Sequence, residues 1–403
     1  MTLPRASIIV VSRHRAAELV RCLLALQQQD HPQIEVIAVA DPAGIKAARD
    51  TGMALKLVEF DQANISAARN LGIAQAAADV VAFIDDDAVA EPTWASRLCA
   101  AFADPQVIAA TGFVRGRNGI SYQWQACEVD AMGLDHPLPA APALYSGTPQ
   151  RAVKTQGTNC AFRRAALTGI GGFDPALRFY LDEADVNLRL AGHGLTAVVP
   201  QAQVHHGFAA SARRRDDRVP LSLHEIAASI AVFLRRHAPE VLDQECIPPI
   251  EAQTARVARL GQQRRISADE AEALRASLAS GWDDGMARPL SALLPMVGLT
   301  PGFQPLGQTG PRPGRLIAGR GWQKTRLLRQ AAEARAAGEI VTVLCLSPTP
   351  RAHRLHFTDQ GIWLHTGGLF GWSTRTGPRF RLARFSTRVR EERARLAQFR
   401  PVG

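Results

Sequence analysis

The sequence predicts an α/β protein whose central sheet is mixed, mostly parallel and flanked by helices. Over the first 90 residues, short apolar runs alternate with stretches of helical spacing. This alternation is typical of strand–helix–strand units, which build parallel sheets. The apolar runs are nearly continuous, as expected of strands that are buried on both faces. Because ligands bind beyond the carboxyl ends of such strands, the polar residues that follow each strand are the candidate site residues.

The expected elements follow one another along the chain in a regular order. Strands are expected over residues 7–11, 34–39, 54–58, 80–84, 107–114, 159–162 and 196–199. Helices with apolar residues at helical spacing are expected over residues 15–29, 66–77, 94–103, 182–191 and 221–237. The stretch at 132–150, which is rich in Pro and Ala, is expected to form a loop.

Three regions are expected within the 403 residues. Residues 1–240 form the main α/β domain, and residues 241–320 form a helical and Pro/Gly-rich linker. Residues 321–403 form a small basic α+β extension. The linker is expected to hold helices at about 249–260 and 267–280, and the extension helices at 322–337 and 384–399. The strands of the extension, expected to form a small antiparallel unit, are 339–346, 354–357 and 361–365.

The net charge of +10 is unevenly distributed between the two halves of the chain. Residues 1–200 carry 17 Lys+Arg and 20 Asp+Glu, whereas residues 201–403 carry 30 and 17. All the excess positive charge therefore lies in the second half. We expect no nucleic-acid partner; the basic half is predicted to meet an anionic polymer, another partner or an acidic membrane surface, or simply to be solvated.

The cysteines and the apolar runs indicate the cellular compartment of the protein. The six cysteines are scattered without a C-x-x-C pair, which fits reduced thiols in a cytoplasm better than zinc or disulfides. The N-terminus lacks the pattern of a signal peptide, and no run of about 18 apolar residues suggests a membrane-spanning helix. We therefore predict a cytoplasmic protein, with peripheral contact at the inner membrane face as a further hypothesis.

An acidic triplet, Asp85-Asp86-Asp87, follows the strand expected at 80–84 and is the strongest single feature of the sequence. Three adjacent carboxylates repel one another and cost stability unless a cation neutralises them. Oxygen-rich carboxylate sites suit Mg²⁺ or Mn²⁺, which also bridge to phosphates. The alternative is an acidic turn that caps the following helix.

Other polar residues lie at comparable positions. Asp41 follows the second expected strand, where its carboxylate can accept hydrogen bonds from a nucleobase or a ribose, although it also suits a simple turn. Arg69 lies near the start of an expected helix and can contact a phosphate or orient the carboxylates. Trp124 can stack on a sugar ring or serve as a buried aromatic residue.

Several motifs in a fixed order identify a resemblance. They are Val10–Arg15, Asn64–Gly72, Phe83–Asp87 with Pro92 and Trp94, Gly157–Arg163, Gly171–Asp174 and Leu181–Leu190. Together they resemble the family 2 glycosyltransferases, whose catalytic domain has the GT-A fold, over about residues 5–210. Each motif is weak alone, but the ordered set is specific.

The sequence departs from the family pattern at three points. Ser66 replaces the usual Gly of the second motif, and Ala40-Asp41-Pro42-Ala43 stands where the family has "D-D-G-S". The acidic pair of the last motif is reversed, as Asp182-Glu183. Glu183 therefore occupies the position of the family's catalytic base, with Asp182 as the reserve candidate.

The resemblance implies an inverting transfer of a sugar, of the hexosyltransferase class, from a nucleotide-diphosphate sugar to an acceptor hydroxyl. It implies a divalent metal, Mn²⁺ or Mg²⁺, held by Asp85, Asp87 and His205. The nucleotide- or substrate-binding candidates are Ser12, His14, Asp41, Asn64, Arg69, Asp85, Asp86 and Trp124. The basic run Arg213–Arg215 either closes over the diphosphate or is simply solvated. A glycan or lipid-linked acceptor, in cell-surface polysaccharide or glycoconjugate synthesis, completes the prediction.

Two alternatives belong to other functional classes. A nucleotidyltransferase on a similar fold has a Gly-rich first loop, and the loop here, Ser12–Ala16, contains no glycine. A catalytically inactive binding module is disfavoured by the intact acidic triplet and by the candidate base. A processive membrane synthase is disfavoured by the lack of apolar spans and of a "Q-x-x-R-W" motif.

Overall fold

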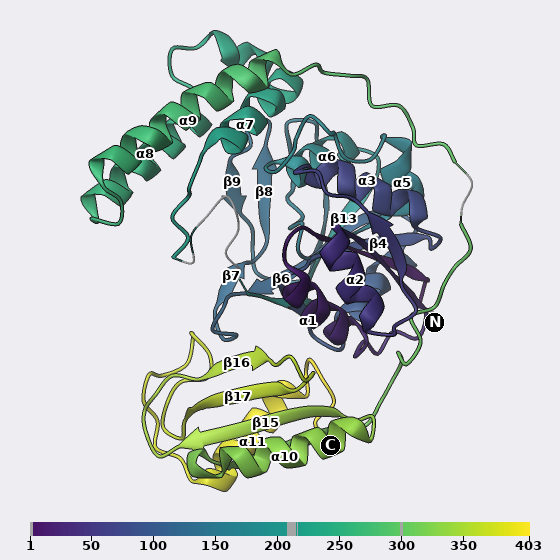
Figure 1. Ribbon diagram of the computed structural model, residues 1–403, viewed down its shortest axis with the longest axis vertical. Helices are drawn as coiled ribbons and strands as arrows, with labels where there is room; N and C mark the ends of the chain where they lie inside the picture. Colours follow the sequence, from purple (N-terminus) through teal and green to yellow (C-terminus); the bar gives the residue numbers. More distant parts are fainter. Residues whose placement is uncertain (1–2, 208–214, 216, 299–300) are drawn as a thin grey trace.

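The computed structural model describes residues 3–207, 215, 217–298 and 301–403 (Figure 1). Arg213 and Arg214 lie outside the described residues, so their predicted role is not addressed by the structure. Arg215 lies on the surface, where its guanidinium pairs with Asp217 at 2.8 Å. No helix among the described residues has both the length and the apolar character needed to cross a membrane.

The main domain is built on one large sheet. Its strands are β1 (Ala6–Ser12), β2 (Ile34–Ala40), β3 (Lys56–Glu59), β4 (Val80–Asp85), β5 (Ala88–Ala90), β6 (Val107–Arg115), β7 (Tyr122–Trp124), β10 (Ala143–Ser146), β12 (Cys160–Arg163) and β13 (Leu195–His206). The order is β10-β13-β6-β12-β4-β1-β2-β3, with β5 on β13 and β7 on β6. β4, β1, β2 and β3 run parallel, β12 runs antiparallel to both its neighbours, and β6 and β13 are parallel. The predicted mixed, mostly parallel sheet is confirmed.

Helices cover both faces of this sheet because alternate strand residues point to opposite sides. Ile8 and Val10 of β1 share a core with α1 (Ala16–Leu26), α2 (Pro42–Asp50) and α4 (Trp94–Ala100). Ile9 belongs to the opposite core, with α3 (Ile65–Gln75), α5 (Arg164–Gly169) and α6 (Asp182–Leu190). A short 3-10 turn, Ala101–Ala103, extends α4. The continuous apolar strands predicted from the sequence thus reflect burial on both faces.

Two parts of the main domain differ from the sequence prediction. The expected loop at 132–150 contains β9 (Asp135–Pro137) and β10, and β9 joins β8 (Cys127–Asp130) and β11 (Arg151–Val153) in a separate sheet. These strands have three or four residues each, too few for a periodic pattern to be visible in the sequence. Helix α2, which the sequence prediction missed, begins at Pro42, whose ring suits the first helical turn.

A helical arm follows the main domain. It consists of α7 (His224–His237), a 3-10 turn (Pro239–Asp243), α8 (Pro248–Gln262) and α9 (Ala268–Ala287). α9 packs closely on α7, since a Cβ at Gly281 would lie 2.1 Å from the carbonyl oxygen of His224. From the arm, an extended segment returns along the outside of the main domain (Figure 1). In this segment the backbone N–H of Gln304 donates a hydrogen bond to Glu35 Oε2 at 2.9 Å.

The C-terminal unit has its own sheet. Its strands are β14 (Gly314–Arg320), β15 (Ile340–Ser347), β16 (Arg354–Phe357) and β17 (Trp363–Gly368), and its helices are α10 (Lys324–Ala336) and α11 (Phe385–Leu396), with a 3-10 turn at Gly321–Gln323. The order is β14-β15-β17-β16, and only β16 is antiparallel to its neighbour. The predicted antiparallel unit is confirmed for β16 with β17 but wrong for β15, which pairs with β17 in parallel because β16 lies on the far side of β17. β14 and β15 are parallel because α10 is a crossover helix between them. The predicted boundary at residue 321 falls inside this strand–helix–strand unit.

The C-terminal unit packs against α1 and β5 of the main domain. Ala25 and Val89 from the main domain share an apolar cluster with Leu355, Phe357 and Trp363. Polar contacts border this cluster, with the indole N–H of Trp363 donating to Gln28 Oε1 at 3.1 Å. β5 directly follows the acidic triplet, so the C-terminal unit supports the segment beside the candidate site.

Candidate active site

The parallel strands bring the predicted polar residues to one edge of the sheet. In the register of β1 with its neighbours, Val11 lies opposite Asp85 and Ser12 lies opposite Ala40. Ser12, Asp41 and the acidic triplet therefore meet where three strands end. This confirms the expected placement of these side chains at the carboxyl ends of the strands.

Asp86 is the buried member of the triplet. It accepts a hydrogen bond from Ser12 Oγ at 2.7 Å and pairs with Arg15 at 2.7 Å. Burial, only partly offset by Arg15, raises the pKa of Asp86 to about 8. Ser12 and Asp86, both predicted to bind the nucleotide, are thus hydrogen-bonded to each other, and their role in nucleotide binding stays a prediction. Arg15, which the sequence analysis did not assign, also lies 3.4 Å from Asp87 and neutralises part of the triplet.

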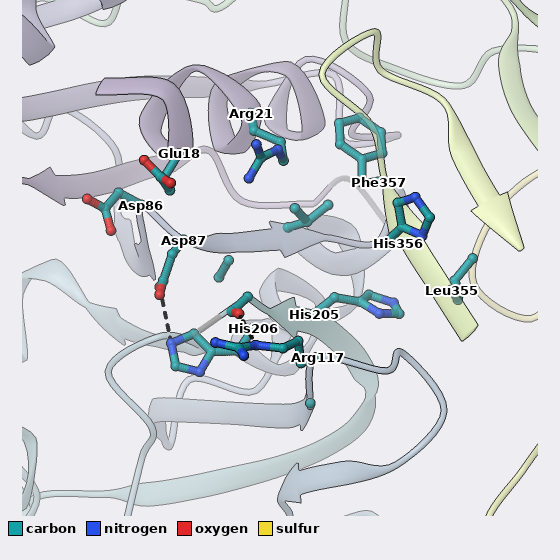
Figure 2. Close-up of a pocket in the computed structure, with 14 residues that line it drawn as sticks. Glu18, Arg21, Asp86, Asp87, Arg117, His205, His206, Leu355, His356 and Phe357 are labelled. Atoms are coloured by element: carbon teal, nitrogen blue, oxygen red, sulfur yellow. Dashed lines mark hydrogen bonds and ion pairs between the residues drawn. The ribbon is translucent and has the colours of Figure 1, made fainter. Parts of the chain in front are cut away.

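Asp85 and Asp87 face a histidine across the end of the sheet. His206 Nε2 lies 3.1 Å from Asp87 Oδ1 (Figure 2). The same nitrogen lies 3.9 Å from Asp85 Oδ2. The three groups lie close enough together, within 4.8 Å, to hold one metal ion. Two carboxylates and an imidazole suit Mn²⁺ or Mg²⁺, with the imidazole favouring the transition metal. The cluster thus fits the predicted cation at Asp85 and Asp87.

The predicted histidine ligand has to be corrected from His205 to His206. His205 Nε2 bonds Glu91 Oε1 at 2.8 Å, and its ring packs against Trp363 of the C-terminal unit. Neighbouring residues of a strand point to opposite sides. Only one of the two histidines of β13 can therefore face the carboxylates, and it is His206.

Two residues of β7 hold the ring of His206. His206 Nδ1 lies 3.0 Å from Gln123 Oε1, so it donates to that oxygen and directs Nε2 toward the carboxylates. This is the arrangement by which a second hydrogen bond fixes a metal-binding imidazole. The Trp124 ring centroid lies 5.6 Å from that of His206, and the indole is partly exposed beside the cluster. Its predicted role in binding a substrate ring remains a prediction.

The candidate base lies at the start of α6. Leu181, with a φ of 64°, turns the chain so that Asp182 and Glu183 open the helix. The guanidinium of Arg69 pairs closely with Asp182 and lies 3.6 Å from Glu183 Oε1 and 3.8 Å from Asp85 Oδ1. A Cβ at Gly157 would lie 1.8 Å from Glu183 Oε1 and 2.4 Å from Arg69 Nη2. This close approach explains why the motif at 157 begins with glycine.

The two carboxyls of α6 differ in charge state and in access. Burial raises the pKa of Glu183, but Arg69, a backbone hydrogen bond, Lys154 and the hydrogen bond with Asp182 together outweigh that effect and keep the pKa below its ordinary value. Burial and the charge of Glu183 raise the pKa of Asp182 well above its ordinary value, against the effect of Arg69. The side chain of Asp182 is 2% exposed and that of Glu183 is 21% exposed. Glu183 is therefore ionised and reachable, whereas Asp182 anchors Arg69.

The loop after β1 holds the remaining nucleotide candidates. His14 has a φ of 58°, and its backbone N–H donates to Asp41 Oδ1 at 2.9 Å. The ring of His14 is exposed and lies 3.5 Å from Asp61. Asn64 caps α3, because its Oδ1 accepts the N–H of Ala67, and its Nδ2 donates to the carbonyl of Pro175 at 2.9 Å. Asn64 thus stabilises the start of α3. The hydrogen bond between His14 and Asp41 shapes the loop after β1, which faces solvent.

A pocket of about 170 Å³ adjoins the carboxylate cluster, and the C-terminal unit forms one of its walls (Figure 2). Asp86, Asp87 and His206 line one side, and Arg21 of α1 lies across from them. The wall from the C-terminal unit is β16, through Leu355, His356 and Phe357. This contribution is not predictable from the sequence, since nothing in the sequence shows which surface β16 packs against.

Behind the pocket, a buried polar network joins the two units. Glu91, just after β5, accepts hydrogen bonds from His205 and from Arg400 near the C-terminus. The guanidinium of Arg400 stacks 3.6 Å from the ring centroid of Trp363. Burial opposes the charge of Glu91, but Arg400 and His205 outweigh it and lower the pKa of Glu91 to about 2. The network fixes the strand segments on either side of Asp87 and His206.

Comparison with known proteins identifies the class of the main domain. Residues 7–171 match the family described as glycosyl transferase family 2. This match confirms the resemblance that the ordered motifs predict. No curated protein matches the chain in sequence.

Two solved structures resemble parts of the chain. One is described as GalNAc-T7 with UDP, GalNAc and Mn²⁺; it is 16% identical, with a TM-score of 0.45, over 58% of this chain and 48% of that chain. The chain therefore spans about half the length of that protein. The other is a mannosyltransferase from Pyrobaculum calidifontis in complex with GDP-Man and Mn²⁺; it is 19% identical, with a TM-score of 0.42, over 71% of this chain and 88% of that chain.

Proposed function

We propose that the protein transfers a sugar from a nucleotide-diphosphate sugar to an acceptor hydroxyl with inversion, using Glu183 as the base. The observation that carries this proposal is the position of Arg69. Its guanidinium lies 3.8 Å from Asp85 Oδ1 and 3.6 Å from Glu183 Oε1. The base and the metal-binding carboxylates therefore face the same space, as a single displacement requires.

Different residues of the chain have different roles in the proposed reaction. Arg69 keeps Glu183 ionised, so that its carboxylate can take the proton of the attacking hydroxyl. Asp182 holds Arg69 in place from below. A divalent ion at Asp85, Asp87 and His206 would supply positive charge against the departing diphosphate. We take Mn²⁺ as the first candidate because an imidazole belongs to the ligand set.

The wider role follows from the site and from the basic second half. We propose a glycan or lipid-linked acceptor, and a place for the enzyme in the cytoplasm at the inner membrane face, in surface polysaccharide or glycoconjugate synthesis. The excess of basic residues in the second half supports contact with an acidic surface. A hexose is the first choice of donor sugar.

The experiment begins with the donor. UDP-, GDP- and dTDP-hexoses are screened with Mn²⁺ by thermal shift, because a bound donor stabilises the fold. Turnover of the best donor is then measured for the wild type and for Glu183→Gln. We expect the substitution to lower turnover by about 10²–10⁴-fold, as for loss of a general base, while donor binding stays unchanged.

Two results would count against the proposal. Donor binding without turnover by the wild type, with any of a panel of acceptors, would favour a binding module. Full activity of Glu183→Gln would assign the base elsewhere. Asp50→Asn, which changes an exposed carboxylate on α2, is the matched control and should leave turnover intact.

A further inference from the structure

The C-terminal unit contains a second pocket, which the proposed reaction does not use. It has a volume of about 540 Å³ and lies where the parallel strands β14, β15 and β17 end. Its lining includes Gly321, Lys324, Ser347, Arg351, Arg354 and Thr366. Open α/β sheets bind ligands at this position, beyond the carboxyl ends of the strands. The place in the fold therefore matches that of a ligand site.

All the charged side chains that line this pocket are positive. Lys324 opens α10, whereas Arg351 and Arg354 lie together at the start of β16 and in the loop before it, and no carboxylate lies among the lining residues. None of the three cations has an ion-pair partner in the part of the chain that the structure describes. Carboxylates of the same unit are paired with other residues, as in Glu339 with Arg315 and Asp359 with Arg21. The pocket thus concentrates positive charge without an internal counterion.

The backbone around the pocket adds further donors. β14 leads through Gly319-Arg320-Gly321 into α10, whose first residue is Lys324. A Cβ at Gly319 would lie 2.9 Å from Gln323 Oε1 and from the side chain of Leu327, so the end of β14 packs closely on the start of α10. The start of a helix presents unpaired N–H groups and a partial positive charge, which favours phosphate. Ser347 and Thr366 place two hydroxyls in the same lining.

Strand β16 connects this pocket to the catalytic one. Arg354 lines the C-terminal pocket, and the next three residues of the strand line the pocket beside Asp87 and His206. His356 lines the catalytic pocket, and its pKa is lowered by burial and by the charges of Lys324 and Arg21. A ligand held at Lys324 would therefore lie one strand away from the catalytic pocket.

We propose that this C-terminal pocket binds the phosphate group of a phosphorylated ligand. The three unpaired cations supply the charge, and the glycine turn with the start of α10 supplies N–H donors. The ligand is either a soluble phosphate ester or a phospholipid headgroup, which share this chemistry. The site is separate from the acidic edge of the main sheet and does not depend on sugar transfer.

The test measures binding of inorganic pyrophosphate to the full chain by calorimetry, in EDTA so that no metal bridges it to the acidic edge. The variant Lys324→Ala/Arg351→Ala/Arg354→Ala is compared with Arg326→Ala/Arg329→Ala/Arg390→Ala. The control removes the same charge from exposed positions outside the lining. We expect the first variant to lose about 10- to 100-fold in affinity and the control to lose less than about twofold.

A second arm identifies the source of the phosphate. Sedimentation with phosphatidylglycerol vesicles, with phosphatidylcholine vesicles as the neutral control, is measured for the same proteins. Selective loss of both pyrophosphate and vesicle binding in the pocket variant indicates a lipid headgroup, and loss of pyrophosphate binding alone indicates a soluble ester. Equal losses in the two variants, or no saturable pyrophosphate binding by the wild type, would overturn the proposal. Turnover of the nucleotide-sugar, measured in parallel, reports on the proposed function independently.

Discussion

The two sheets of this protein place polar groups at the same structural position but with opposite charge. The main sheet gathers Asp85, Asp86 and Asp87 where its parallel strands end, and the C-terminal sheet gathers Lys324, Arg351 and Arg354 at the equivalent edge. The main sheet holds partial counterions of its own in Arg15 and Arg69, whereas the C-terminal cluster has none in its lining.

This difference shows how one architecture serves two kinds of ligand. The carboxyl edge of a parallel sheet is open, and the residues that follow each strand decide what it attracts. Carboxylates there attract a metal ion and, through it, a diphosphate. Cations there attract a phosphate directly. We therefore expect ligand binding at the end of the main sheet (the acidic edge) to depend on a metal ion. Ligand binding at the end of the C-terminal sheet (the basic edge) should not depend on one.

The largest expected effect is at the acidic edge. We expect Asp87→Asn to abolish stabilisation by Mn²⁺ and to lower turnover by about 10²–10³-fold, comparable to the loss of an electrostatic group at a reacting centre. The physical reason is that the variant removes one of the two carboxylate charges, Asp85 and Asp87, that face His206. Thermal shift with and without Mn²⁺ checks the first result, and nucleotide release checks the second.

Pyrophosphate binding at the other edge, in the C-terminal pocket, serves as the control for this experiment. Asp87→Asn should leave metal-free pyrophosphate binding by the C-terminal pocket unchanged. If Mn²⁺ stabilised the variant as much as the wild type, the acidic edge would not be the metal site and the comparison would fail.

The sequence could predict much of the acidic edge because its residues follow strands with a clear apolar pattern. Asp85 and Asp87 follow a strand whose end periodicity locates, whereas Glu183 is indicated by the resemblance of Leu181–Leu190 to the family motif. Arg15 is not predictable in this way, because an arginine in a loop after a strand looks like a solvated residue. His205 was chosen over His206 because the register of β5 with β13, which decides the facing side, is not written in the sequence.

The basic edge was beyond sequence analysis for a different reason. Arg351 and Arg354 lie in one short stretch, and their meeting with Lys324 depends on the crossover through α10. The first strand of that crossover, β14, lies in a stretch rich in Pro and Gly that suggested a linker. Charge excess could be counted in advance, but its concentration in one pocket required the fold.

The second prediction concerns the junction between the two units. Glu91→Gln should lower the free energy of unfolding at pH 7 by about 3 kcal/mol, which is the value of a pKa depressed from its ordinary 4.5 to about 2. The ionised form is favoured by folding, so this stability is fully present above pH 4.5 and is lost as the pH falls toward 2.

Urea unfolding at pH 7 and pH 4 measures this effect. The difference between wild type and variant should shrink by about 1 kcal/mol at the lower pH, because the unfolded wild type is by then largely protonated. Glu240→Gln, at an exposed position, is the control and should show no such dependence. A pH-independent difference would mean that Glu91 acts through packing rather than through its charge.

The smallest expected effect separates the two neighbouring histidines of β13. His206→Ala should weaken Mn²⁺ binding by about 10- to 100-fold, the range found when the ligand environment of a metal is altered. His205→Ala should leave Mn²⁺ affinity within about twofold, because its ring bonds Glu91 and packs on Trp363 instead of facing the carboxylates. Electron paramagnetic resonance of added Mn²⁺ measures the free ion directly. If His205→Ala weakened binding as much as His206→Ala, the junction with the C-terminal unit would control the metal site, and the two edges would be coupled.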